Sequence, residues 1–588
     1  MPGPRLDLIL PQTPSVAPFD RRFFTGKEKL TAIGRGALGG KAHGLALMRD
    51  ILESRLAPSY RPEIEIVVPT LTVITTEFFD VFMKQNDLAE VAHSGQRDDL
   101  IAAAFQKADL PAQLVGDLRA LIAQVQAPLA VRSSSLLEDA MFEPFASVYA
   151  TKMIPNNQMS PDARFLKLVE AVKFVYASTF FKDAKNYIQA TRHATADEKM
   201  AVIIQEVVGV RHGDRFYPQI SGVARSYNFY PLGNARPADG VIDLALGLGK
   251  TIVDDGVAWS YSPAFPKANP PYNTLDDLLS QTQSEFWAIN MGWPLEFNPI
   301  KETEYMMKFG LAEAERDGVL QFLASTYRAQ DDKIVYGIAE KGPRVIDFAP
   351  ILKFDLIPLN TMLRTLLKLC EETLERMVEV EFALTLDERR GAPARFGFLQ
   401  VRPMVVSEAE VHIAADEMTG PNVLVASEAA LGNGVLDNIR DIVYVKPEKF
   451  NVHHSEAVAS ELESLNHGLM SSGSPYLLIG FGRWGTSDPQ AGIPVNFGQI
   501  CGARMIVESA LPETSSMLSQ GSHFFHNITS FKVFYLSVSQ WDRYKIDWDW
   551  LKARETVRET EYARHVKLTS PLEIKVDGTT GRGVIRHD

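Results

Sequence analysis

The most constraining feature of the sequence is a pair of alternating polar and apolar segments, 379–384 and 396–403, joined by a polar connection. Alternation with a period of two is typical of a half-buried β-strand, in which every second side chain points to the same face. The sequence therefore predicts two strands, each with one polar face. Four side chains occupy these faces: Glu379, Glu381, Gln400 and Arg402.

If the two strands pair as a hairpin, two carboxylates, a carboxamide and a guanidinium converge on one surface. Carboxylate and amide oxygens suit Mg²⁺, and a guanidinium suits phosphate oxygens. The alternative for such a hairpin, taken alone, is an ordinary solvated face of a sheet. Stretches earlier in the chain decide between the two interpretations.

Length and charge narrow the class of protein. The chain has 588 residues, enough for roughly three or four domains, and 46% of them are hydrophobic, as in globular proteins. A net charge of −13 argues against general nucleic-acid binding. Two distant cysteines give neither a disulfide framework nor a zinc-binding spacing. Because no apolar run suits a signal peptide or a membrane span, we expect a cytoplasmic protein that does not bind membranes.

Two upstream segments carry residue types that handle phosphate. A glycine-rich turn at 34–44 contains Lys41 and precedes a helical pattern, so its backbone amides and the lysine could approach an anion. It is not a P-loop, because no Ser or Thr follows the lysine, and the alternative is an ordinary turn. At 128–135 an apolar strand leads into Arg132 and three serines, which could grip phosphate. The alternative is a surface arginine followed by serines that start a helix.

Four short motifs occur in one order along the chain: Gly39-Gly40-Lys41-Ala42, Ala130-Val131-Arg132-Ser133-Ser134, Phe145-Ala146-Ser147 and Leu399-Gln400-Val401-Arg402-Pro403. In this order they resemble the nucleotide-binding domain of the phosphoenolpyruvate synthase and pyruvate phosphate dikinase family, which has an ATP-grasp fold. Supporting stretches lie at 202–208, 221–224 and 245–250. The resemblance covers about residues 20–406 of the printed sequence.

The resemblance implies a role for each matching position. Lys41 and Arg132 would hold the ATP phosphates, and Arg402 would also contact phosphate. Glu381 and Gln400 would hold Mg²⁺. Three further residues are implied in nucleotide binding. Glu379 stands at a position where the family has an acidic residue, and Gln205 and Glu206 would lie near adenine. The catalysis implied is phosphoryl transfer by positioning and charge neutralisation, with Arg132 and Arg402 as catalytic residues.

The sequence departs from the family pattern at several points. Ser147 stands where the family usually has glycine, and Lys250 stands where it often has glutamate. The stretch 259–340 matches no motif and is either a lid, an interaction insert or an ordinary α+β insertion. The family's phosphohistidine domain is absent, and the roughly 180 residues after 406 are too few for a barrel of about 250 residues.

We therefore predict a mixed α/β and α+β chain, with an ATP-grasp fold of two subdomains and a smaller C-terminal α/β domain of unknown role. The expected divisions are an arm at 1–26, subdomains at 27–210 and 211–406 with the insertion at about 259–340, and the last domain at 418–588. Strands are expected at 423–426, 442–445, 476–480 and 531–538. The tail motifs at 482–485 and 521–527 resemble the tails of bacterial proteins that carry only this nucleotide-binding domain.

Two functions are compatible with these residues. One is an ATP- and Mg²⁺-dependent phosphotransferase of the phosphoenolpyruvate synthase type with an unknown acceptor. The other is a nucleotide-responsive regulatory protein that signals to a partner protein. The product nucleotide, AMP or ADP, and self-association into a homo-oligomer are left open. His523 is a candidate phosphoryl carrier, beside His526 only if this stretch is helical; the alternative is that both are structural.

Overall fold

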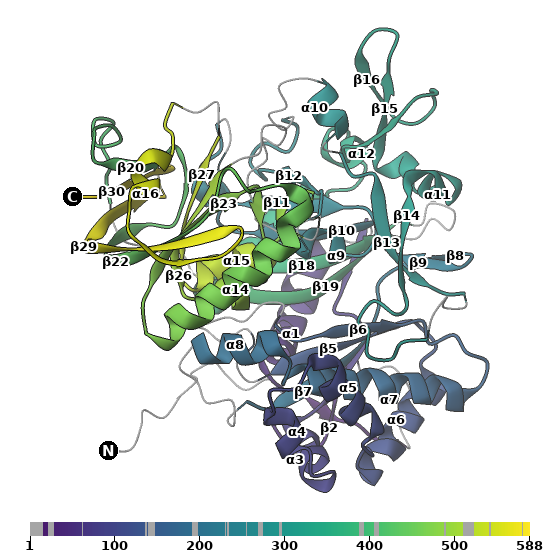
Figure 1. The fold of residues 1–588 in the computed structure, drawn as a ribbon. Coiled ribbons are helices and arrows are strands. Elements are labelled where there is room, and N and C mark those ends of the chain that lie inside the picture. The colour runs from purple at the N-terminus through teal and green to yellow at the C-terminus, as the bar shows by residue number, and fades with distance from the viewer. Residues whose placement is uncertain are drawn as a thin grey trace.

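The computed structural model describes residues 16–21, 29–60, 63–135, 138, 148–190, 198–229, 231, 234–254, 256–268, 275–280, 282–292, 297–386, 393–404, 411–486, 488, 490–509, 523–539, 543–578 and 580–588. In this part of the chain, helices and strands form two six-stranded sheets, several small sheets and a nine-stranded C-terminal sheet (Figure 1). The predicted mixed α/β architecture is confirmed. No helix in the described ranges combines the length and the apolar character that a membrane crossing requires.

The first six-stranded sheet belongs to the N-terminal third. Its strands, in spatial order, are β1 (Ala17–Pro18), β2 (Leu30–Ile33), β4 (Leu71–Ile74), β7 (Met200–Glu206), β5 (Leu129–Ser135) and β6 (Thr151–Ile154). Four helices follow β4: α3 (Thr76–Gln85), α4 (Ala89–His93), α5 (Asp98–Lys107) and α6 (Ala112–Gln124). The long helix α7 (Pro161–Ser178) contacts α5, α6 and the sheet, and its apolar side chains share their core.

The second six-stranded sheet contains the predicted hairpin. Its strands, in spatial order, are β12 (Trp259–Tyr261), β11 (Val241–Ala245), β10 (Ile220–Arg225), β18 (Val378–Thr385), β19 (Ala394–Pro403) and β3 (Ile64–Val67). The hairpin prediction is confirmed, because β18 and β19 pair antiparallel with Glu379 opposite Arg402 and Glu381 opposite Gln400. Helices α1 (Gly40–Ile51) and α13 (Leu359–Leu374) pack apolar side chains into the core on this sheet.

The chain crosses from one sheet to the other within a few residues. Strand β3 pairs with β19 in the second sheet, whereas β4, which begins at Leu71, pairs with β2 and β7 in the first. The two strands on either side of Pro69 therefore belong to different sheets. This crossing links the edge strand of the second sheet to an inner strand of the first.

The unassigned stretch 259–340 has both helices and strands. After β12 it contains α10 (Leu275–Ser280), β13 (Glu285–Asn290), β14 (Met306–Gly310), α11 (Leu311–Arg316), β15 (Ala324–Arg328) and β16 (Lys333–Tyr336). Its strands pair with strands outside it, because β13 pairs with β9 (Arg215–Tyr217) and β15 pairs with β17 (Arg344–Ile346). β9 also pairs with β8 (Val210–His212). The stretch is thus built into the surrounding fold.

The C-terminal sheet follows an order that local patterns do not reveal. Its strands, in spatial order, are β20 (Val423–Ser427), β30 (Arg582–Arg586), β29 (Ala563–Asp577), β22 (Gly434–Val445), β23 (Tyr476–Phe481), β26 (Ala503–Ser509), β27 (Phe534–Val538) and β21 (Ala429–Leu431), with β28 (Thr556–Glu559) on β29. Strands β22, β23, β26 and β27 are parallel neighbours. Helices α14 (Ser455–Ser471) and α15 (His523–Ser530) lie on two of the connections between them. The predicted α/β character and all four predicted strands are confirmed.

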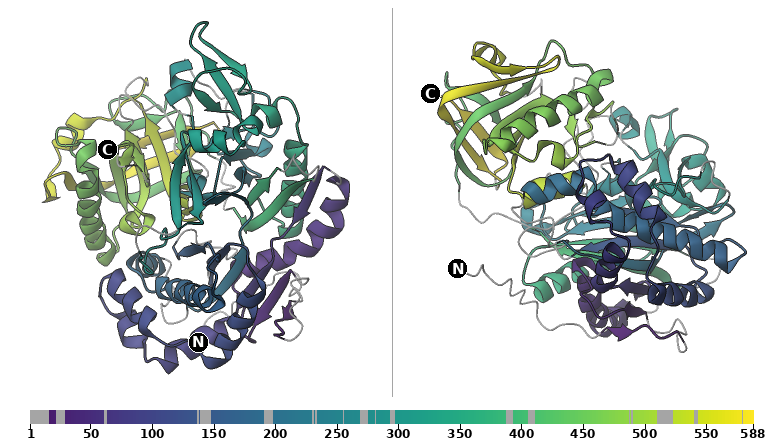
Figure 2. Two further views of the ribbon diagram at one scale, coloured as in Figure 1. Left: turned by 90° about the vertical axis from the view of Figure 1, so that its right-hand side faces the viewer. Right: turned by 60° about the horizontal axis from the view of Figure 1, so that its bottom comes forward.

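The C-terminal part packs directly against the N-terminal third (Figure 2). Tyr187 and Ile188 of helix α8 (Lys182–Ala190) belong to the same buried cluster as side chains of α14, α15 and the C-terminal sheet. The ring of Tyr187 meets that of Phe531 edge-on, with centroids 4.8 Å apart. Helix α8 is therefore shared between the two cores.

Candidate functional site

A row of charged side chains crosses three adjacent strands of the second sheet. Arg225 on β10 lies opposite Glu379 on β18, which in turn lies opposite Arg402 on β19. Arg225 Nε lies 2.6 Å from one carboxylate oxygen of Glu379, and Arg402 pairs with the other oxygen. All three residues are at most 2% exposed. Arg225 also donates to Asp243 on β11 at 2.9 Å, so each buried charge has an opposite charge beside it.

Glu381 lies at the more open end of the same face. Its side chain is 18% exposed and stands opposite Gln400. The guanidinium of Arg132 is 3.7 Å from one of its oxygens, and that of Arg402 is 4.0 Å from the other. These distances are at the limit of an ion pair, and the carboxylate keeps access to solvent. An incoming group could therefore reach it without dismantling the sheet.

Arg132 connects the two six-stranded sheets. It extends from β5 in the first sheet and donates to the side-chain oxygen of Gln400 at 2.7 Å and to the carbonyl of Leu399 at 2.9 Å, both on β19 in the second. It also donates to Gln205 on β7 at 3.2 Å. The structure thereby brings together Arg132, Gln205, Glu379, Glu381, Gln400 and Arg402.

The glycine-rich turn places Lys41 near the end of the same strand, β5. Gly39 has a φ of 78°, and an added Cβ would lie 1.8 Å from the carbonyl oxygen of Ser134, so only glycine fits. The amide of Ala42 in the first turn of α1 donates to Ser134 Oγ at 3.1 Å. Lys41 Nζ is buried, 2.7 Å from Glu138 and 3.2 Å from Ser133 Oγ. The turn is therefore held against the strand that carries Arg132.

The two residues predicted near adenine end strand β7. Gln205 is buried and lies opposite Ala130 in the sheet, whereas Glu206 is only partly buried and its amide donates to Thr70 at 2.9 Å. At this end of β7, Glu206 is therefore partly accessible to solvent, next to the buried Gln205. Their role in binding adenine stays a prediction.

The turn before Lys250 lies at the end of strands β10 and β11. Ser221 donates to the carbonyl of Gly247 at 2.6 Å, and Lys250 begins the short helix α9 (Lys250–Val253). Lys250 Nζ lies 2.5 Å from Asp254. Burial lowers the pKa of Lys250, but the nearby carboxylates of Asp254 and Glu302 outweigh burial and raise the pKa overall. Lys250 is therefore a charged group held by Asp254.

Two predicted features fall partly or wholly outside the described residues. Ser147 and the rest of its motif lie in 139–147, outside them. His523 begins α15, and His526 lies in the same helix, so the helical condition for neighbouring histidines is met. The side chains of both histidines are outside the description. The role of His523 as a phosphoryl carrier stays a prediction.

Three charged residues of the network were not singled out from the sequence: Arg225, Asp243 and Glu138. Arg225 and Asp243 could have been noticed in the sequence, because an arginine at the end of a strand and an aspartate inside an apolar strand are both unusual. Glu138 carried none, because only the fold brings it to Lys41. Within the described ranges no group of three or more His, Cys, Asp or Glu side chains forms a metal site.

A glycine-rich turn, a buried charge network and an arginine between two sheets define an α/β protein with a site suited to phosphate. Residues 35–421 match the pyruvate phosphate dikinase AMP/ATP-binding domain family. The match spans more than half of the chain, and the chain belongs to this family. It is therefore a member of a family of ATP-binding phosphotransferase domains. A search of curated proteins found no match.

Proposed function

We propose that this chain is an ATP- and Mg²⁺-dependent phosphotransferase resembling phosphoenolpyruvate synthase, with an acceptor still to be identified. The observation that carries the proposal is the position of Arg132, which donates from one sheet to Gln400 of the other at 2.7 Å. A guanidinium between two sheets, with a second arginine and a carboxylate alongside, is suited to a polyphosphate chain. The family match supports ATP as the source of this polyphosphate chain.

The cationic residues of the site would hold the phosphates. Among the partners that the structure describes, Arg132 donates at hydrogen-bond distance to neutral oxygens, those of Gln205, Leu399 and Gln400. Phosphate oxygens carry negative charge and accept stronger hydrogen bonds from a guanidinium than neutral amides do. We therefore expect Arg132 to exchange these partners for ATP. Lys41 would share its charge between Glu138 and the phosphates.

The donor set around Glu381 fits Mg²⁺. A carboxylate and a carboxamide oxygen stand opposite each other on adjacent strands, and Mg²⁺ is commonly held by one or two protein oxygens together with phosphates and water. Bound there, Mg²⁺ would neutralise phosphate charge. Glu379 differs, because both of its oxygens are bound by arginines. We assign it the role of positioning Arg402 rather than binding the nucleotide itself.

The direct test of function is product analysis. Purified chain, labelled ATP and Mg²⁺ are incubated with a small-molecule cell extract, and the nucleotides are separated by chromatography. We expect ADP or AMP to form only when extract and Mg²⁺ are both present, and we expect no phosphoenolpyruvate when pyruvate is the sole acceptor. The Arg402→Ala variant should be inactive, whereas Arg316→Ala, at a 69% exposed guanidinium on α11, should match the parent. Formation of phosphoenolpyruvate, or equal activity of both variants, would contradict the proposal.

A second candidate is a nucleotide-responsive regulatory protein. The observation in its favour is that α8, in the domain that matches the family, contributes Tyr187 and Ile188 to the core of the C-terminal part. Movement of α8 on nucleotide binding would shift the C-terminal sheet, which a partner could sense. In the same assay this candidate predicts that ATP binds and is recovered intact with every extract.

A further inference from the structure

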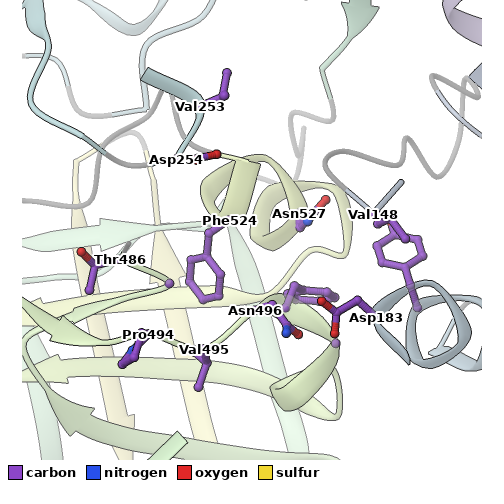
Figure 3. Close-up of a pocket in the computed structure, with 14 residues that line it drawn as sticks. Val148, Asp183, Val253, Asp254, Thr486, Pro494, Val495, Asn496, Phe524 and Asn527 are labelled. Atoms are coloured by element: carbon purple, nitrogen blue, oxygen red, sulfur yellow. The ribbon is translucent and has the colours of Figure 1, made fainter. Parts of the chain in front are cut away.

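A cavity of about 270 Å³ lies where the nucleotide-binding domain meets the C-terminal part (Figure 3). Its walls come from separate parts of the chain: Val148, helix α8, the end of α9, and C-terminal residues at 485–486, 494–498, 524 and 527. Asp183 of α8 and Asn496 of the C-terminal part lie next to each other on one side (Figure 3). The volume suits a small metabolite rather than a nucleotide.

The charged side chains among the described residues that line the cavity are all acidic. It includes two carboxylates, Asp183 and Asp254, and three aromatic rings, those of Tyr187, Phe497 and Phe524. None of the described lining residues is a lysine, arginine or histidine. An anion here would meet two carboxylates without a cation facing it. An ammonium ion would find both an opposite charge and aromatic faces, which attract cations.

Asp183 has more negative than positive side chains near it. Burial, together with the nearby carboxylates of Asp98 and Glu463, raises its pKa to about 6. Lys182 and Asn496 oppose this rise, but the ammonium of Lys182 lies 2.5 Å from Glu463, which already uses its charge. A cation in the cavity would therefore stabilise the ionised form of Asp183.

The cavity is connected to the turn that carries Lys250 through the four-residue helix α9. Helix α9 starts with Lys250, beside the turn that receives the hydrogen bond of Ser221, and its last residue Val253 and the following Asp254 line the cavity. Asp254 lies 2.5 Å from Lys250. A cation that attracts Asp254 would weaken this pair and leave Lys250 freer to meet phosphate.

We infer that this cavity is a binding site for a small organic ammonium ion, and that its occupation increases the affinity of the nucleotide site through Asp254 and Lys250. The second half of the inference rests on the proposed function, because it requires ATP at the neighbouring site. Coupling of this kind is reciprocal, so ATP should equally increase the affinity for the ammonium ion.

Binding is tested with matched pairs of probes on the full chain: glucosamine against glucose, putrescine against butanediol, and choline against its uncharged carbon analogue. Isothermal titration calorimetry should show at least one ammonium probe binding about tenfold more tightly than its match. Asp183→Asn should abolish that preference, and Asp162→Asn, at an exposed aspartate of α7, should preserve it. Absence of any preference, or an Asp183→Asn variant that binds like the parent, would overturn the site.

Coupling is tested by titrating MgATP in the presence and absence of the ammonium probe that binds. We expect ATP to bind several-fold more tightly with the probe, and Asp254→Asn to remove the difference. An unchanged ATP affinity in the parent would overturn the coupling. If the probe binds and ATP does not bind at all, the proposed function fails while the ammonium site stands, so the two failures can be told apart.

Discussion

At the scale of single residues, the two glutamates of the hairpin have different surroundings although they are two positions apart. Glu379 is 2% exposed, and its two oxygens are bound by Arg225 and Arg402. Glu381 keeps 18% of its side chain exposed and has arginines only at 3.7 and 4.0 Å. The first is suited to hold the network together, and the second is suited to bind a ligand.

This contrast predicts that replacing Glu379 lowers the stability of the fold far more than replacing Glu381 does. Glu379→Gln should lower the free energy of unfolding by about 3–5 kcal/mol, because it leaves two buried guanidinium groups without their shared carboxylate. Glu381→Gln should cost less than about 1 kcal/mol, because its arginines lie at the limit of ion-pair distance, at 3.7 and 4.0 Å. Urea denaturation of both variants measures the difference. Equal losses would show that the two glutamates have the same role.

Asp183 predicts a pH dependence of stability. Its pKa is raised from 3.8 to about 6, mainly by burial and also by Asp98 on α5 and Glu463 on α14, against Lys182 and Asn496. The folded chain therefore binds the proton more tightly than the unfolded chain, and the fold loses stability as the pH rises from about 4 to about 6. Asp183→Asn should be more stable than the parent at about pH 8, and the gain should shrink towards pH 5. A gain that is constant with pH in urea denaturation would contradict this.

At the scale of elements, the start of α1 depends on the fit of one turn against β5. Gly39 leaves no room for a Cβ beside the carbonyl of Ser134, and the amide of Ala42 is bound by the hydroxyl of the same serine. The position of Lys41 follows from this contact. Displacement of the turn would move the lysine away from Ser133 and Glu138.

Gly39→Ala should therefore lower both stability and MgATP affinity, the latter at least about tenfold through loss of a charged contact. Gly213→Ala is the matched control, because Gly213 also has a positive φ, of 60°, but an added Cβ would have open space within 4 Å. It should cost stability and leave MgATP affinity unchanged. Affinity that falls equally in both variants would indicate a general effect of backbone strain.

Helix α15 contains His523, the predicted phosphoryl carrier. Its residues Phe524 and Asn527 line the cavity between the two parts of the molecule, and His523 and His526 belong to the same helix. With ATP labelled in the β- or γ-phosphate and an alkaline quench, we expect acid-labile label on the parent and none on a His523→Ala, His526→Ala double variant. Label that persists in the double variant would exclude both histidines as carriers.

Local periodicity was sufficient for the hairpin and its four polar side chains, because strand alternation is encoded within eight or ten consecutive residues. It could not reveal Arg225 and Asp243 as partners, since β10 and β11 precede β18 by well over a hundred residues and register is set by the whole sheet. The cavity was equally hidden, because segments far apart in the sequence form it. Family motifs located Arg132, but not its bond to Gln400 across two sheets.

At the scale of the whole molecule, the nucleotide-binding domain and the C-terminal part form one continuous packing. The family match ends at residue 421, and the C-terminal sheet begins at Val423. The apolar side chains of α8 nevertheless lie in the core of that sheet. Any closure of the two six-stranded sheets around a nucleotide must therefore either carry the C-terminal part along or alter the cavity between them.

The most direct test of the account is the Mg²⁺ dependence of ATP binding to the full chain, measured by isothermal titration calorimetry. The parent should bind ATP with Mg²⁺ and at least about tenfold more weakly with a chelator, whereas Glu381→Gln should bind equally weakly in both conditions. Arg316→Ala, at an exposed guanidinium on α11, should behave as the parent does. Equal affinity of the parent with and without Mg²⁺, or a Glu381→Gln variant that keeps the Mg²⁺ dependence, would contradict the assignment of the site.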